Sequence, residues 1–243
     1  MPSAWEERLG TAIAGLDVEG LRQRFQAEGE FLFLEQFLPA DLVADLVSEI
    51  RPLLPRAHRA YVPFVRKAGT IGQGQLAREA PRLDALYRSA EFRAFASRLT
   101  DQELVPKGDT DAHAAALYVY DRRGDHVAFH YDDCGCDGAS FTATLGLIDR
   151  STSRVEMQLD RQDPTRPRRD KVVSMAPGSL LFFRGSKVYH RVTPLGDGEE
   201  RAVFSCAYVE KNKQARGKRR FWENAKDALL FFGPKALFQK NYR

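Results

Sequence analysis

The chain has 243 residues, 43% of them hydrophobic, which is enough for a single large domain with a buried core. Its 37 basic and 33 acidic residues give a net charge of only +4, and no apolar run approaches the roughly 18–20 residues of a membrane span. Three cysteines cannot form a disulfide framework, and an odd number is typical of a reducing compartment. We therefore expect one soluble, cytoplasmic domain over residues 1–243, with no signal peptide and no membrane span.

The front of the chain, about residues 1–112, is predicted to be helical. Residues 39–54 (PADLVADLVSEIRPLL) place apolar side chains along one helical face, with a proline at the exit. A second helix is expected to begin after Ser89, a good N-cap, and to end before Pro106. Residues 69–74 (GTIGQG) are interpreted as a glycine-bearing loop that lacks the full signature of a phosphate-binding loop.

The back of the chain is rich in predicted strands. From about residue 113, short segments with β-branched and aromatic residues alternate with Gly, Asp, Pro and Arg. Eight such segments are AALYVY, HVAFHYD, SFTATLGLI, VEMQL, KVVSM, SLLFF, KVYHRV and RAVFSCAYV. This density of strands is typical of an antiparallel barrel or a jelly roll. We predict an α+β fold, with a jelly-roll core over 113–210 and the N-terminal helices packed outside it.

The segment HVAFHYDDCGCDG, residues 126–138, contains the first candidate metal ligands. Alternate side chains of a strand share a face, so His130 and Asp132 point the same way. A third ligand must come from elsewhere, and His190, at the end of a strong predicted strand, is the candidate that a jelly roll would bring across the barrel. Two histidines and one carboxylate with open coordination positions form the ligand set of non-haem Fe(II) oxygenases.

Other residues around this segment are interpreted as bystanders. Cys134 and Cys136 lack a second cysteine pair for a zinc site, so we expect them in a loop. Asp133 faces the wrong side if the strand continues. His126 is expected on the same strand face as His130, but about 13 Å away, where a supporting or surface role is favoured over metal binding. Cys206 lies in a predicted strand and is expected in the core.

A fourth residue makes the pattern more specific. Arg201 follows His190 with ten residues between them, and 57 residues separate Asp132 from His190. With FLFLEQFLPADLV and APGSLLFFRGSKVYHRVTPL, this spacing resembles the 2-oxoglutarate- and Fe(II)-dependent oxygenases, whose core is a double-stranded β-helix, over most of residues 30–210. The resemblance implies that His130, Asp132 and His190 bind Fe(II), that O2 and 2-oxoglutarate bind beside them, and that Arg201 pairs with the far carboxylate of 2-oxoglutarate.

A narrower resemblance bears on the reaction. LYVYDRRGDHVAFHYD and LYRSAEFRAFASRLTDQELVP look like the group that contains amino-acid halogenases and their hydroxylase cousins. Halogenases carry a small residue where this chain has Asp132, so hydroxylation is favoured. The position at which prolyl-hydroxylase relatives place a tyrosine against 2-oxoglutarate is Leu147 here. Tyr118, Thr142 and Thr144 are the alternative hydroxyl partners.

The substrate is left open by these patterns. A small polar metabolite such as an amino acid is favoured by the narrower resemblance. The alternatives are a modifier of a protein or nucleic acid, docked through the basic tail over 211–243 and the insertion RQDPTRPRRDK, and a non-catalytic cupin-like binding module. From Glu210 to Arg243 there are ten basic and three acidic residues, but no nucleic-acid motif, so a solvated surface is the preferred interpretation. A homodimer remains an open alternative.

Overall fold

The computed structural model describes residues 3–108, 111, 114–132 and 138–211. Its helices in these ranges are α1 (Ala4–Ala14), α2 (Val18–Ala27), α3 (Ala40–Ile50), the 3-10 helix η1 (Arg51–Arg56), α4 (Gln73–Glu79), α5 (Pro81–Arg88) and α6 (Ala90–Thr100). Its strands are β1 (Phe31–Leu34), β2 (His58–Val62), β3 (Arg66–Gly72), β4 (Leu104–Pro106), β5 (Ala115–Tyr120), β6 (His126–His130), β7 (Ser140–Arg150), β8 (Val155–Leu159), β9 (Arg169–Val173), β10 (Leu180–Arg184), β11 (Tyr189–Val192) and β12 (Glu200–Glu210). No helix in these ranges is long and apolar enough to cross a membrane.

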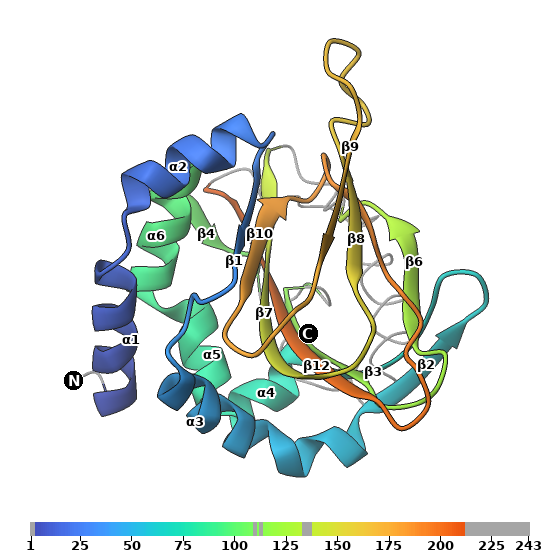
Figure 1. Cartoon of the computed structure of the whole chain (residues 1–243). Helices are drawn as coiled ribbons and strands as arrows, with labels where there is room; N and C mark the ends of the chain where they lie inside the picture. Colours follow the sequence, from blue (N-terminus) through green and yellow to red (C-terminus); the bar gives the residue numbers. More distant parts are fainter. Residues whose placement is uncertain (1–2, 109–110, 112–113, 133–137, 212–243) are drawn as a thin grey trace.

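The strands form one antiparallel sheet that curls round on itself (Figure 1). Its order is β1-β10-β7-β12-β5-β3-β6-β11-β8-β9, with β2 added beside β3 and β4 beside β12. Most neighbours in this order, apart from the pairs β8-β9 and β2-β3, are not consecutive in the sequence, so many connections cross between the two halves of the barrel. The predicted jelly-roll core with helices outside is confirmed.

The two faces of the curled sheet bury two different apolar clusters. In β10, Leu180 and Phe182 join the large core beneath the helices, whereas Leu181 and Phe183 join a smaller cluster inside the barrel. Each fully buried side chain of this size stabilises the fold by roughly 1.5–3 kcal/mol. A strand that is apolar on both faces therefore marks where the sheet is covered by helices outside and closed on itself inside.

The helices cover the outer face of the sheet, and Figure 1 shows α1, α2, α5 and α6 gathered on one side of β1, β10 and β7. Helix α3 turns Leu42, Leu46 and Ile50 into the core, as the helical spacing of its apolar residues predicts. Helix α6 begins after Ser89, whose hydroxyl accepts a hydrogen bond from the Phe92 amide at 3.0 Å. Both helices predicted from the sequence are confirmed, although α3 ends at Ile50 and continues as a 3-10 helix.

All eight strands predicted in the back of the chain are present, and Cys206 is buried in β12 as expected. Sequence reasoning missed β1, β2, β3 and β4 in the front. The predicted loop at 69–74 is wrong, because β3 runs to Gly72 and α4 begins at Gln73. A side chain at Gly69 would lie 3.0 Å from the Ala57 side chain and 3.2 Å from that of Val119. This glycine serves close packing of strands rather than a turn.

Two sequence predictions fall outside the described residues. The basic tail lies there from residue 212 onward, and so do Asp133, Cys134 and Cys136. The division of the single domain at residues 112 and 210 stays a prediction.

Candidate metal centre

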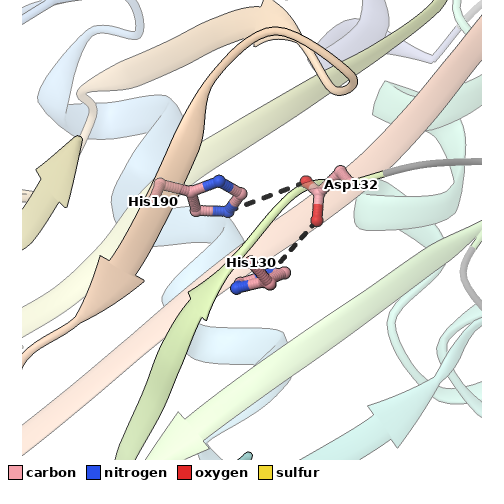
Figure 2. Close-up of side chains that lie close together, drawn as sticks. All are labelled: His130, Asp132 and His190. Atoms are coloured by element: carbon pink, nitrogen blue, oxygen red, sulfur yellow. Dashed lines mark ion pairs between the residues drawn. The ribbon is translucent and has the colours of Figure 1, made fainter. Parts of the chain in front are cut away.

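Two adjacent strands bring the predicted ligands together. His130 ends β6, His190 lies in β11, and the two residues are direct partners in the antiparallel pairing of these strands. Asp132 follows β6, and its carboxylate lies beside both imidazoles, facing one ring with each oxygen (Figure 2). Its Oδ1 is 3.3 Å from Nε2 of His130, and its Oδ2 is 3.8 Å from Nε2 of His190. One ligand atom from each residue lies within 4.8 Å of the others, so the three side chains converge on one point.

The backbone orients both imidazoles with Nε2 toward this point. Nδ1 of His130 lies 2.9 Å from the carbonyl oxygen of Ala128, and Nδ1 of His190 lies 3.1 Å from that of Val188. A carbonyl can only accept, so each Nδ1 carries the proton and donates it. In the neutral form of each ring the Nε2 lone pair can then bind a metal ion, which is the arrangement that outer hydrogen bonds impose on metal-binding histidines.

Asp132 is held as a carboxylate. Burial works to raise its pKa, but the electrostatic interaction with His190 and the hydrogen bonds from His130 and Thr142 together hold the pKa well below its usual range. The Thr142 hydroxyl donates to Oδ2 over 2.7 Å. The pKa of His190 is lowered by burial. Burial also works to lower the pKa of His130, but the hydrogen bond and charge of Asp132, together with the Ala128 carbonyl, raise the pKa overall. A charged carboxylate beside two imidazoles is an electrostatic site for a cation.

His126 does not belong to this cluster. His190 pairs with His130 and Val192 pairs with Val127, so β6 has one extra residue between the two pairs. This bulge turns Val127 into the cavity together with His130. The adjacent His126 therefore faces the other side of the sheet, and the prediction that it shares the face of His130 is wrong.

The triad opens into a cavity of about 120 Å³ inside the barrel, which Arg201 also lines. Arg201 is only 1% exposed, and its guanidinium donates to the Ser153 hydroxyl at 3.3 Å and lies 5.4 Å from the centre of the Tyr120 ring. Its Nε has no hydrogen-bond partner within the described ranges, and no carboxylate of those ranges forms a salt bridge with it. A buried cation of this kind is suited to an anion that enters the cavity.

Several solved structures have a similar architecture. The chain is similar to the epimerase SnoN, solved with Fe3+, alpha-ketoglutarate and nogalamycin RO, at 18% identity and a TM-score of 0.62 over 83% of this chain and 88% of that one. It is similar to a Trichoplax adhaerens prolyl hydroxylase in complex with a peptide fragment of hypoxia-inducible factor, at 14% identity and a TM-score of 0.65, over 86% and 94% of the two chains. A member of the 2OG-Fe(II) oxygenase family from Burkholderia pseudomallei matches at 16% identity and a TM-score of 0.57, over 82% and 93%.

The chain has the fold of the 2-oxoglutarate- and Fe(II)-dependent oxygenases. No protein-family model matches the sequence, and no curated protein matches it either. The fold is therefore recognised from three-dimensional similarity together with the local spacing of a few residues.

The donor set of this oxygenase fold fits the groups that the resemblance implies. Two imidazole nitrogens and one carboxylate oxygen converging from one side are suited to Fe(II) and leave coordination positions open on the cavity side. The unpartnered Nε of Arg201 is a donor that a carboxylate of 2-oxoglutarate would satisfy. The cavity thus contains suitable ligands for Fe(II) and a suitable donor for 2-oxoglutarate.

The hydroxyl candidates near the cavity separate into two sets. Tyr118 and Thr144 line the cavity, and Thr144 shares a 3.1 Å hydrogen bond with Ser205. Thr142 instead donates its proton to Asp132, so it lies beside the candidate metal ligands. Leu147 is buried in the core beneath the helices, on the face of β7 away from the cavity.

Some cavity residues were not predicted. Arg66, Tyr120 and Ser205 line the cavity, and Ser153 bonds to Arg201. The strand pattern of β12 contained a signal for Ser205, because it lies four residues after Arg201 on the same face. The sequence around Arg66 contained no such signal, because β3 itself was not predicted.

A larger hollow of about 600 Å³ lies elsewhere, bordered by α2 and the loop after β8. It contains none of the predicted site residues. Its buried carboxylate, Asp160, already pairs with Arg169 at 2.8 Å, and its Glu30 pairs with Arg184 and Lys187. These charges neutralise one another, so the smaller cavity, and not this hollow, is the candidate functional site.

Proposed function

We propose that the protein is a non-haem Fe(II)- and 2-oxoglutarate-dependent dioxygenase that hydroxylates an unactivated C–H bond of a small polar metabolite, such as an amino acid. The observation that carries this proposal is the position of the triad and of buried Arg201 in the walls of one cavity. A metal ligand set and an anion-binding cation are the two parts that such an enzyme needs, and the fold supports the same assignment.

The triad would hold the iron. When bound, Fe(II) and 2-oxoglutarate supply O2 activation and the oxidation of a substrate C–H bond, with release of succinate and CO2. His130 and His190 present their Nε2 lone pairs in fixed orientations because their Nδ1 protons are held by backbone carbonyls. Asp132 contributes the negative charge, and the Thr142 hydrogen bond holds its second oxygen in place.

Arg201 would bind the far carboxylate of 2-oxoglutarate at the inner end of the cavity. Thr144 and Tyr118 lie in the same lining and can donate to that carboxylate. Burial raises the pKa of Tyr118 to about 12, so its phenol keeps its proton at neutral pH and remains a donor. Val155 and Val192 complete an apolar wall that limits the entry of water.

The outcome of the reaction is inferred from Asp132. A carboxylate at this position fills the coordination site that a halide would need, so transfer of a hydroxyl group is favoured over halogenation. The cavity is smaller than the roughly 300–1,000 Å³ typical of sites for drug-sized ligands. This size supports a small substrate or the end of a longer one.

A macromolecular substrate is the second candidate, because the Trichoplax neighbour was solved with a peptide. The two candidates differ in a measurable way. A peptide or nucleic acid should bind outside the cavity as well as within it, and binding of a nucleic acid to the basic tail should weaken steeply with salt. A small metabolite should bind with little dependence on salt concentration between 50 and 200 mM, the range over which phosphate contacts lose most affinity.

The experiment that tests the proposed function is an anaerobic absorbance titration of metal-free protein with Fe(II) and then 2-oxoglutarate. We expect a weak visible charge-transfer band that requires both additions. Asp132→Ala should abolish the band, and Arg201→Ala should demand far more 2-oxoglutarate for the same intensity. Absence of the band in folded, metal-loaded protein would contradict the proposal and favour a cupin-like binding module.

A further inference from the structure

A second buried arginine lines the cavity of the triad. Arg66 is the first residue of β3, and only 6% of it is exposed. It pairs with Val127 of β6, three residues before His130. Arg201 belongs to β12, which is separated from β6 by β5 and β3 in the sheet order. The two guanidinium groups therefore enter the cavity from different strands, and Arg66 comes from the strand next to the metal ligands.

The Arg66 side chain is held in a defined direction. Its Nη2 donates to the Thr70 hydroxyl over 2.8 Å, so the side chain extends along β3. Its guanidinium carbon lies 5.0 Å from the centre of the Tyr118 ring. A planar cation fixed by an aromatic ring and a hydroxyl is pre-ordered for binding an oxyanion, because little side-chain entropy remains to be lost.

The charges of the cavity wall favour an anionic ligand in addition to 2-oxoglutarate. Among the described residues that line it, Arg66 and Arg201 are cations and Asp132 is the one carboxylate. Fe(II) adds two positive charges and 2-oxoglutarate adds two negative charges. The loaded cavity would then carry one net positive charge, which a monoanionic substrate would neutralise. Neutralising a buried charge is strongly favourable because water is largely absent there.

We propose that Arg66 binds a carboxylate of the substrate, so that the enzyme acts on a small carboxylic acid whose oxidised carbon lies a few bonds from the acid group. This inference rests on the proposed function and narrows its substrate class. The apolar side chains of Val127, Val155 and Val192 line the same cavity and would contact the aliphatic part of such a molecule. Arg66 is thus a specificity residue for substrate, and Arg201 serves the cosubstrate.

The test is calorimetric titration of acetate, propionate and butyrate into anaerobic protein saturated with Fe(II) and 2-oxoglutarate, with the matching amides as neutral probes. We expect the carboxylates to bind and the amides not to bind. Arg66→Gln should weaken carboxylate binding at least about tenfold, as expected for loss of a charge-assisted hydrogen bond, and Arg66→Lys should retain part of it. Binding of 2-oxoglutarate should weaken much less in either variant than in Arg201→Gln, because the contact of Arg66 with the cosubstrate site runs through Tyr118.

The matched control is Lys67→Gln. Lys67 is the next residue of β3, faces the other side of the sheet and donates to the Arg123 carbonyl, so its loss removes the same charge outside the cavity. This control should bind carboxylates like the unchanged protein. Thermal unfolding of each variant shows whether it is folded. If Arg66→Gln does not fold, Arg66→Lys provides a variant that keeps the positive charge.

Three results would overturn the inference while leaving the proposed function intact. These are a charge-transfer band with no carboxylate binding, carboxylate binding that Arg66→Gln does not weaken, and loss of 2-oxoglutarate binding in Arg66→Gln as large as in Arg201→Gln. The last result would assign Arg66 to the cosubstrate site. If the unchanged protein forms no charge-transfer band, the proposed function itself fails, and the substrate assignment fails with it.

Discussion

The backbone of Gly185 lies directly against the backbone of Asp132. The Asp132 amide donates to the Gly185 carbonyl over 3.1 Å, and a side chain added at Gly185 would lie 2.3 Å from the Asp132 carbonyl oxygen and 3.0 Å from its Cβ. Because Asp132 follows the end of β6, this contact fixes the carboxylate where no strand pairing does. A glycine immediately after β10 is therefore part of what positions a candidate metal ligand.

We predict that Gly185→Ala weakens metal binding about 10- to 100-fold, in the range seen when a support of a metal ligand is lost. The added methyl must displace Asp132, since backbone atoms leave it no room. Calorimetric titration with Mn(II), a stable substitute for Fe(II), measures the effect. Gly10→Ala is the control, because its methyl group would meet Glu91 at an ordinary 3.5 Å. Unchanged metal affinity in folded Gly185→Ala would show that Asp132 is positioned by other contacts.

Thr142 and Thr144 should respond differently to the same substitution. Thr142→Val removes the hydrogen bond to Oδ2 of Asp132 and should lower metal affinity about tenfold. Thr144→Val removes the bond to Ser205 and should leave metal affinity nearly unchanged, while raising the 2-oxoglutarate concentration needed for half-saturation. Titrations with Mn(II) and then 2-oxoglutarate separate the two effects. Equal effects on metal binding would contradict the division of roles between these two residues.

Much of the fold could be predicted because its signals are local. The strands of the back show β-branched and aromatic residues in short runs, and the apolar spacing of α3 indicates a helix directly. Strand β3 escaped prediction because its sequence, RKAGTIG, combines two charged residues with two glycines. Its place in the sheet depends on pairing with β2, β5 and β6, which no short stretch of sequence encodes.

The residues of the candidate site also differ in whether local sequence could predict them. His130 and Asp132 could be paired because residue spacing along a strand determines which side chains share a face. His190 could be found from its place at the end of a predicted strand, and Arg201 from the resemblance to a known family. The face of His126 was assigned wrongly because one bulge in β6 reverses the alternation. Arg66 reaches the cavity only through long-range strand pairing, so its role required the three-dimensional structure.

Arg201 should reduce the stability of the metal-free protein. A buried guanidinium without a carboxylate partner costs several kcal/mol of desolvation, which its contacts with Ser153 and Tyr120 offset only in part. We predict that Arg201→Met raises the free energy of unfolding of metal-free protein by about 1–4 kcal/mol. Chemical denaturation measures this change. Adding Mn(II) and 2-oxoglutarate together should stabilise the unchanged protein more than Arg201→Met. A less stable metal-free variant would mean that the arginine contributes net stability.

Metal binding should release one proton near neutral pH. Burial works to lower the pKa of His130, but the hydrogen bond and charge of Asp132 raise the pKa above its ordinary value, so this ring still carries a proton at pH values where a free histidine does not. The pKa of His190 is lowered by burial, so its ring is already neutral there. Because a metal ion must displace the Nε2 proton of His130, affinity should fall about tenfold for each pH unit below the His130 pKa.

The pH dependence of metal affinity distinguishes the two histidines. Mn(II) titrations between about pH 6 and 8, repeated in buffers of different ionisation enthalpy, give both the affinity and the number of protons released. We expect one proton per metal ion over the part of this range that lies below the His130 pKa. Two protons would mean that His190 is also charged before metal binds, and none would mean that Asp132 does not hold a proton on His130. Either result would contradict the electrostatic arrangement in which one carboxylate serves a charged and a neutral imidazole at once.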